Sequence, residues 1–262
     1  MPELSTSRAY QLHMRILISN DDGIYSPGIA ALAEVAGNFA EARVVAPDVE
    51  RSSAGHSITA SAPLSYKRTP LGKIDAWRVN GTPADCVTLG LNRWENVDVV
   101  LSGINLGSNL GNSIWHSGTL AAAKQAALLG MRGIALSTPS TESEPDFELL
   151  KPWVARVLEL LLPAKDLRLV NVNLPASRPR GIKWTQQSVL RYDGNVVPAK
   201  DPMGRSIFWY TVTPLQGAEE GTDLWAIENG FVSVTPLRLD LTDHEQLDRA
   251  RAAHPVEKIV FA

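Results

Sequence analysis

Two adjacent aspartates are the residues of this sequence best suited to chemistry. Asp21 and Asp22 follow a short apolar run, Arg15 to Ser19, and precede Gly23. Neighbouring carboxylates repel each other unless a cation lies beside them, and hard divalent cations prefer oxygen ligands of this kind. The pair therefore indicates a divalent-cation site. The alternative interpretation is that Asp22-Gly23 simply makes a tight turn, as this dipeptide often does.

Two other polar segments offer neutral oxygens for the same cation. Asn105 comes shortly after the apolar run Val97 to Leu101, and Ser52 lies in a small, polar stretch at 51–62. Together with the two aspartates, their amide and hydroxyl oxygens make an oxygen-only ligand set suited to Mg²⁺ or Mn²⁺. An asparagine-rich loop without any role in metal binding is the other interpretation of Asn105.

A candidate phosphate site follows in the same part of the chain. Ser117, Gly118 and Thr119 open an alanine-rich segment that is typical of a helix, and the free N–H groups and positive dipole at a helix start bind phosphate. We expect the side chain of Asn109 to contact the phosphoryl oxygens as well. His116 is a candidate for phosphate contact or proton transfer, although a lone histidine often has only a packing role.

Several other chemistries find no support. No GxxxxGK[ST] or GxGxxG motif follows a predicted strand, which argues against a P-loop ATPase or a dinucleotide dehydrogenase. No Gly-x-Ser-x-Gly elbow is present. The single cysteine, Cys86, cannot form an intramolecular disulfide and is expected to be a buried small hydrophobe, so a reducing compartment such as the cytoplasm fits.

The elements that must position these residues alternate along the chain. Short apolar runs and helical segments follow one another from Met14 onward, which predicts an α/β fold with a mostly parallel sheet covered by helices on both faces. In such sheets ligands bind beyond the carboxyl ends of the strands, where the polar segments would meet. Residues 102–118 are expected to form a structureless functional loop. Expected strands are 15–19, 42–46, 74–79, 97–101, 134–137 and 169–172, and expected helices 28–36, 83 onward, 119–129 and 146–162.

The chain is expected to have three parts. Residues 1–13 have the composition of a flexible extension, with Met14 as an alternative start, and residues 14–175 form the catalytic domain. Residues 176–262 lose the alternation, with strands expected at 183–189, 206–212 and 231–237 and a helix at 242–252, and we expect this β-rich segment to make subunit contacts. The 262 residues carry a net charge of −3 and no apolar stretch of membrane-spanning length, so neither a nucleic-acid polymer nor a membrane is an expected partner.

Several ordered motifs resemble one known family, the SurE proteins, which are metal-dependent 5′/3′-nucleotidases also called stationary-phase survival proteins. The similarity runs from Met14 to about Asp240. The motifs that carry it are Arg15-Ile16-Leu17, Asn20-Asp21-Asp22-Gly23, Ala46-Pro47-Asp48, Arg51-Ser52, Gly55-His56-Ser57-Ile58-Thr59, Gly81-Thr82-Pro83-Ala84-Asp85-Cys86-Val87, Ser102-Gly103-Ile104-Asn105 with Gly107, and His116-Ser117-Gly118-Thr119.

The resemblance implies a Rossmann-like domain that hydrolyses nucleoside 5′- and 3′-monophosphates with metal-activated water. It implies one Mg²⁺ or Mn²⁺ per subunit and a homodimer or homotetramer that exchanges C-terminal elements. The metal ligands it implies are Asp21, Asp22, Ser52 and Asn105, with Ser53 as an alternative to Ser52. Whether Asp21, Asp22 or His116 accepts the proton of the water stays open.

Two rival functions remain. A nucleotide-binding or sensor protein would use the same crevice without turnover. A phosphatase that forms an aspartyl-phosphate on Asp21 is less favoured, because that chemistry usually has Asp-x-Asp after the first strand rather than two adjacent acids.

Overall fold

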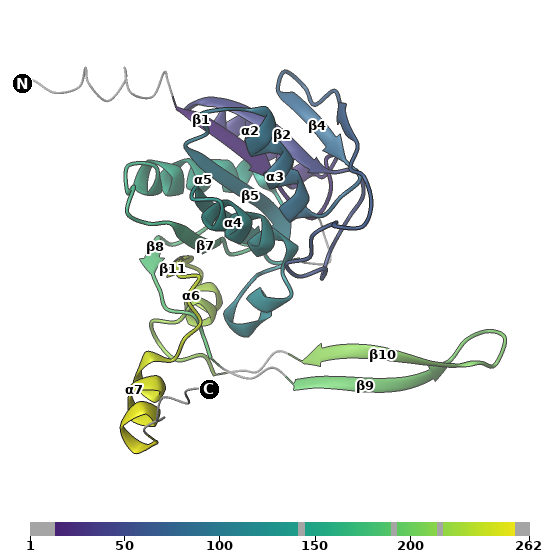
Figure 1. Cartoon of the computed structure of the whole chain (residues 1–262), viewed down its shortest axis with the longest axis vertical. Coiled ribbons are helices and arrows are strands. Elements are labelled where there is room, and N and C mark those ends of the chain that lie inside the picture. The colour runs from purple at the N-terminus through teal and green to yellow at the C-terminus, as the bar shows by residue number, and fades with distance from the viewer. Residues whose placement is uncertain (1–13, 141–144, 190–192, 214–216, 255–262) are drawn as a thin grey trace, which may run out of the picture.

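A nine-stranded sheet forms the centre of the molecule (Figure 1). The structure is a computed structural model that describes residues 14–140, 145–189, 193–213 and 217–254, so the predicted N-terminal extension lies outside the described residues. The strand order is β3-β4-β2-β1-β5-β6-β7-β11-β8. The parallel strands, with every neighbouring pair in the same direction, are β1 (Arg15–Ser19), β2 (Glu41–Pro47), β4 (Asp75–Val79), β5 (Val99–Leu106), β6 (Arg132–Thr138) and β7 (Leu169–Asn173).

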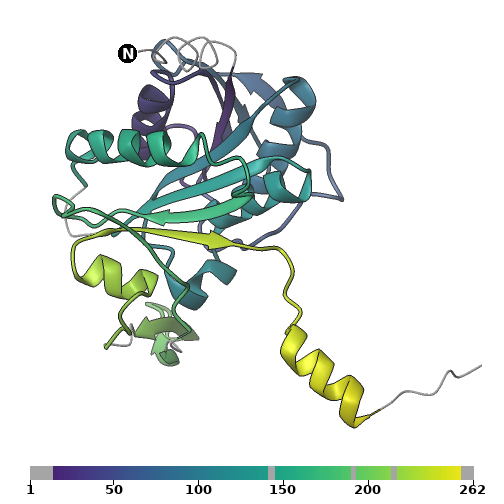
Figure 2. The same cartoon turned by 90° about the vertical axis from the view of Figure 1, so that its left-hand side faces the viewer.

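Helices cover both faces of this sheet, as Figure 2 shows. On one face α2 (Pro27–Ala36) packs against α5 (Phe147–Leu161), and on the other α3 (Pro83–Arg93) packs against α4 (Gly118–Leu128). Strand β1 is buried between the two layers, because Ile16 and Ile18 belong to the apolar core under α2 and α5 while Leu17 belongs to the core under α3. This confirms the predicted α/β class with a mostly parallel sheet.

Local signals set the helix starts. Ser26 caps α2, whose first residue is Pro27, by accepting the N–H of Ile29. Thr82 caps α3, whose first residue is Pro83, and forms a reciprocal capping box with Asp85. Such caps satisfy N–H groups that a helix start leaves without partners. The four helices that cover the sheet therefore begin within about one residue of the predicted positions, and the helix predicted at 242–252 begins two residues later, at His244.

The order in which successive strands are added to the sheet reverses at β1. From β1 the chain moves outward to β2 and β4, and it then returns to the other side of β1 to form β5, β6 and β7. The loops that leave β1 and β5 therefore diverge at this point, which is where ligands bind in open parallel sheets. Asp21 and Asp22 follow β1, and Asn105 lies near the end of β5, so the predicted cation ligands lie at this switch point.

The prediction of a structureless loop over 102–118 was wrong in two places. Strand β5 continues to Leu106, with a register shift against β6 between Ser102 and Asn105, and a 3₁₀ turn, η1, spans Gly111–Trp115. Gly103 has a φ of +136°, and a Cβ added there would lie 2.2 Å from the carbonyl oxygen of Leu136. The glycine that resembles a loop signal thus accommodates a bulge inside a strand.

The C-terminal segment contributes to the main sheet. β11 (Val232–Leu237) pairs antiparallel with β7, and β8 (Ile182–Trp184), shorter than the predicted strand at 183–189, pairs parallel with β11. The remaining described elements are β3 (Tyr66–Arg68), α6 (Asp223–Glu228), α7 (His244–Ala253) and a hairpin of β9 (Asp193–Lys200) and β10 (Ser206–Thr213) that projects from the body (Figure 1). The sequence analysis did not predict β3, β9 or α6. Among the described residues, no helix is long and apolar enough to cross a membrane.

Candidate metal and phosphate site

Asp21 lies at the start of the loop after β1 and is almost completely buried, with 3% of its surface exposed. Its Oδ1 accepts the hydroxyl proton of Thr119 over 2.6 Å. Burial raises the pKa of Asp21, and the Thr119 hydroxyl together with the N–H groups of Thr119 and Gly118 partly opposes that rise. The start of α4 therefore faces the first carboxylate of the pair.

Asp22 is half-buried beside it. The N–H of Leu106 donates to Asp22 Oδ2 over 3.1 Å, which connects the acidic pair to the end of β5. Burial raises the pKa of Asp22 to about 7, and the negative charges of Asp21 and Glu50 add to the rise. A carboxyl group in this environment gains most from a nearby positive charge.

Asn105 and Ser52 approach the pair from two other loops. Asn105 is buried, and its Nδ2 donates to the Gly107 carbonyl oxygen over 2.6 Å, so this hydrogen bond leaves its amide oxygen for a ligand. Ser52 is exposed and donates its hydroxyl proton to Glu50 Oε1 over 2.6 Å. The N–H of Arg51 donates to the Asp21 carbonyl oxygen over 2.7 Å, which ties the loop containing Ser52 to the acidic pair.

The chemistry of these residues fits a hard divalent cation. Neither Asp21 nor Asp22 forms an ion pair with another residue in the described ranges, although burial raises the pKa of both and the charge of Asp21 adds to the rise at Asp22. Those ranges also contain no group of three or more His, Cys, Asp or Glu side chains placed to hold a metal. A cation here would therefore take two carboxylates and complete its shell with neutral oxygens, for which Ser52 and Asn105 are suitable.

The predicted phosphate-binding residues gather at the start of α4. The Ser117 side chain caps the helix by accepting the N–H of Leu120 over 3.0 Å. The main chain of Gly118 lies against Asp21, and Thr119 is fully buried with its hydroxyl directed to the same carboxylate. The side chain of Thr119 and the N–H groups of Gly118 and Thr119 thus face Asp21, which leaves the positive end of the helix dipole as the feature suited to an anion.

Asn109 is buried behind this helix start rather than open to solvent. Its Nδ2 donates to Ser137 Oγ over 2.8 Å and to Thr119 Oγ1 over 3.4 Å. Its main chain is fixed on both sides, because its carbonyl oxygen accepts Nδ2 of Asn171 and of Asn173 and its N–H donates to Asn173 Oδ1. Asn109 is therefore connected to Asp21 through Thr119, and its Nδ2 is bonded inside the protein rather than open to a phosphate.

His116 lies at the exposed rim of the site. Its carbonyl oxygen accepts the N–H of Gly55 over 3.1 Å, which joins the loop containing Ser52 to the loop before α4. His56 in the first of these loops contacts Gln125 of α4 through Nε2 and Oε1, 2.8 Å apart. The three polar segments predicted to meet do lie together.

Sequence reasoning missed Glu50, Asn171 and Asn173. The signal for the asparagines was available, since Leu-Val-Asn-Val-Asn places two amides on one face of an otherwise apolar strand. Amides are buried in that way only where they find hydrogen-bond partners. For Glu50 no comparable pattern exists, because its role depends on a loop conformation.

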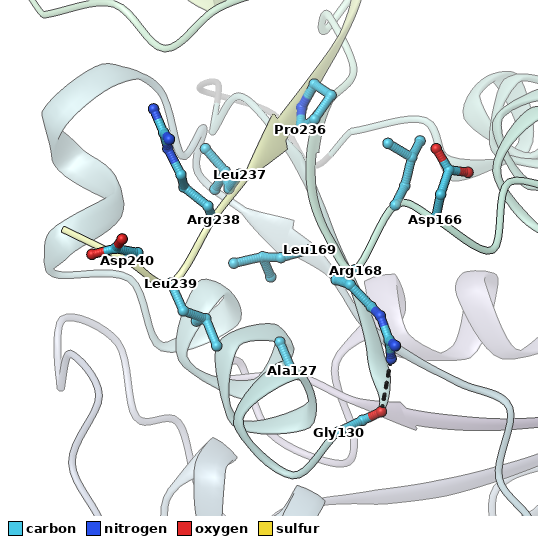
Figure 3. Close-up of a pocket in the computed structure, with 11 residues that line it drawn as sticks. Ala127, Gly130, Asp166, Arg168, Leu169, Pro236, Leu237, Arg238, Leu239 and Asp240 are labelled. Atoms are coloured by element: carbon cyan, nitrogen blue, oxygen red, sulfur yellow. Dashed lines mark hydrogen bonds between the residues drawn. The ribbon is translucent and has the colours of Figure 1, made fainter. Parts of the chain in front are cut away.

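An open groove of about 600 Å³ lies at the opposite end of the strands, near the amino end of β7 (Figure 3). It lies between the end of α4 and the start of β7, where Arg168 donates to the Gly130 carbonyl oxygen over 3.1 Å. The candidate site lies beyond the carboxyl ends of the strands, so this groove is separate from it. Its lining residues are Ala127, Gly130, Asp166, Leu167, Arg168, Leu169, Pro236, Leu237, Arg238, Leu239 and Asp240.

Comparisons with known proteins agree on one family. Residues 16–194 match the family model described as Survival protein SurE. The chain is 49% identical over 242 residues to 5′-nucleotidase SurE 1 of Thermus thermophilus, covering 90% of this chain and 96% of the relative. It is 43% identical over 251 residues to 5′-nucleotidase SurE of Deinococcus radiodurans, covering 92% and 93%. The crystal structure of the SurE protein from Aquifex aeolicus superimposes with a TM-score of 0.78 at 38% identity, covering 91% of this chain and 99% of that one.

Proposed function

Since this chain belongs to the SurE family, we propose that it releases inorganic phosphate from nucleoside 5′-monophosphates, and from 3′-monophosphates, with one bound Mg²⁺ or Mn²⁺. The protein is a nucleotidase of the hydrolase class. The proposed ligands are Asp21, Asp22, Ser52 and Asn105. The cytoplasm is the location that we expect from the sequence.

The buried acidic pair at the switch point is the observation that supports this proposal most. A nucleotide-binding protein without turnover needs only the start of α4 to hold phosphate. Two adjacent carboxylates with raised pKa values add nothing to anion binding and oppose it by charge. They are useful to a protein that places a cation next to the phosphate.

A divalent cation in such a site supplies Lewis-acid polarisation of a phosphoryl oxygen and lowers the pKa of water. The residues of the chain supply orientation. The positive end of the dipole of α4 favours a phosphoryl group at the helix start, and Thr119 holds Asp21 in one position. Asp21, Asp22 and His116 at the rim are the candidates for proton transfer.

The assay that tests this function is phosphate release from AMP, with and without EDTA. We expect release that EDTA abolishes and that added Mn²⁺ or Mg²⁺ restores. Binding of AMP without release of phosphate under either condition would contradict the proposal and would favour the sensor function.

We further propose that the protein is a homodimer or homotetramer assembled through the hairpin β9–β10. Phe208, Trp209 and Tyr210 on β10 are each more than 60% exposed. The hairpin forms a two-stranded sheet of its own, apart from the main sheet. Isolated two-stranded hairpins are marginally stable, and exposed aromatic residues are enriched at protein interfaces, so a second copy of the chain is the expected cover.

A further inference from the structure

Asp223, far from the acidic pair in sequence, is a fully buried carboxylate that no step above uses. It lies in the first turn of α6, after the cap residue Thr222. Its Oδ2 accepts the N–H of Gly111 over 2.8 Å, and its Oδ1 accepts the N–H groups of Ser188 and Leu224 over 2.8 Å each. One side chain thus joins the turn η1 to two points of the C-terminal segment.

Burying this charge is costly, and the structure compensates it only with main-chain donors. Among the described residues Asp223 has no ion-pair partner. Burial raises its pKa, while the N–H groups of Gly111, Ser188 and Leu224 oppose the rise. Because all three partners are donors, the arrangement suits an ionised carboxylate, which only accepts hydrogen bonds.

The contact with Gly111 is also close in space. Gly111 has a φ of +52°, and a Cβ added there would lie 2.9 Å from the Ser188 carbonyl oxygen. Gln187 donates to the Gly111 carbonyl oxygen and to Asn112 Oδ1, over 3.3 and 3.2 Å. The beginning of η1 is therefore held from the C-terminal segment on several sides.

From Gly111 the connection continues to the acidic pair. Two residues earlier in the chain, Asn109 donates to Thr119, and Thr119 donates to Asp21. Beyond η1 the same loop continues through His116 and Ser117 into α4. The loop from Gly107 to Ser117 thus leads into the proposed phosphate site and is fixed near its middle by Asp223.

We infer that Asp223 is a positioning residue for phosphate release, because its carboxylate holds the 107–117 loop in the arrangement that binds the phosphoryl group. The inference deepens the proposed function and rests on it. It assigns part of the active site to the segment beyond β7, which the sequence analysis assigned to subunit contacts.

The test compares Asp223→Asn and Asp223→Ala with a control in the same segment, Thr185→Val. Thr185 is buried and hydrogen-bonds the hydroxyls of Ser233 and Thr235 without touching the loop, so its loss destabilises the segment alone. The measurements are Ki for inorganic phosphate, kcat and KM for AMP, Kd for Mn²⁺, melting temperature, and amide hydrogen exchange of residues 107–117 in the metal-free protein.

We expect Ki for phosphate to weaken by about 10–100-fold, the range for residues that orient a ligand, with alanine worse than asparagine. Kd for Mn²⁺ should change less than Ki for phosphate, because the loop reaches Asp21 only indirectly, through Thr119. Exchange of the loop should accelerate in both Asp223 variants and stay unchanged in Thr185→Val at a similar melting temperature. Unchanged Ki and loop exchange in Asp223→Asn, or equal changes in the control, would overturn the inference.

A second variant covers the case in which the Asp223 variants do not fold. Gly111→Ala keeps the buried carboxylate and pushes the loop away from Ser188, so it should weaken Ki for phosphate to a similar degree. A wild-type Ki in Gly111→Ala would also overturn the inference. Hydrogen exchange needs no turnover, so a wild-type protein that fails to hydrolyse AMP would contradict the proposed function and leave the hold on the loop separately measurable.

Discussion

The main chain of Gly118 lies so close to the side chain of Asp21 that no residue larger than glycine fits at position 118. A Cβ added to Gly118 would lie 2.7 Å from Cβ of Asp21 and 2.8 Å from its Oδ2. The start of α4 and the first carboxylate are therefore one rigid unit. A nucleotide phosphate bound at the helix start would meet the cation at a distance set by this contact.

Gly118→Ala should therefore damage catalysis while the fold survives. The added methyl group must displace Asp21, and a shift of about 1 Å in a catalytic group can cost about 100-fold in rate. We expect kcat/KM for AMP to fall by about that factor. Gly130→Ala follows the same helix and meets nothing within 4 Å, but it strains the backbone at a φ of +82°, so it is the control for lost helix stability. A normal kcat/KM in Gly118→Ala would contradict this close contact.

Replacing either aspartate should abolish phosphate release. We expect Asp21→Asn and Asp22→Asn each to lose more than about 100-fold in kcat, the upper range for residues that only orient a ligand. The thermal stabilisation that Mn²⁺ gives the wild type should disappear in both variants. Near-wild-type turnover in both would refute the cation site.

The stability of the metal-free protein should depend on pH through Asp22. Its folded-state pKa, about 7, lies above the ordinary value of 3.8. The unfolded chain therefore loses this proton first, so the contribution is most favourable below pH 4 and is lost as pH rises toward 7. In EDTA, the melting temperature of Asp22→Asn relative to wild type should rise across this window, by about 2–4 °C for each 1 kcal/mol.

The register of the loop after β2 can be tested with two neighbouring serines. Ser52→Ala should weaken the affinity for Mn²⁺ and be partly rescued by excess Mn²⁺, since the residue would supply one neutral oxygen. Ser53, at a φ of +58°, is the matched control. If Ser53→Ala needs the excess cation and Ser52→Ala does not, the assignment is wrong by one residue.

The exposed aromatic strand predicts the assembly. Replacing Phe208, Trp209 and Tyr210 together by serine should convert a dimer or tetramer into smaller species, as measured by light scattering, because the apolar cover is lost. The main sheet should keep its melting transition, since it pairs without these residues. A wild-type protein that is monomeric at micromolar concentration would exclude this role of the hairpin.

The sequence predicted the features that depend on neighbours along the chain. The caps at Ser26 and Thr82 and the alternation of strands and helices are local patterns, and the three polar loops follow from the rule for parallel sheets. The hydrogen bond between Asp223 and Gly111 joins residues 112 positions apart. No local periodicity in the sequence predicts such a bond. Gly103 in β5 likewise has the sequence signature of a loop, and only the structure shows that it lies at a bulge inside a strand.

The carboxylate of Asp223 also closes a long excursion of the chain. It accepts the N–H of Ser188 and that of Leu224, so the two ends of the segment that contains the hairpin are bonded to the same side chain. The entropy of closing a loop grows slowly with its length. A change in the length of the segment between Ser188 and Asp223 should therefore alter the entropy cost of closing it only slightly. The turn at Met203 and Gly204, where the side chain of Met203 is 81% exposed, is a natural position for grafting a foreign peptide or a reporter domain.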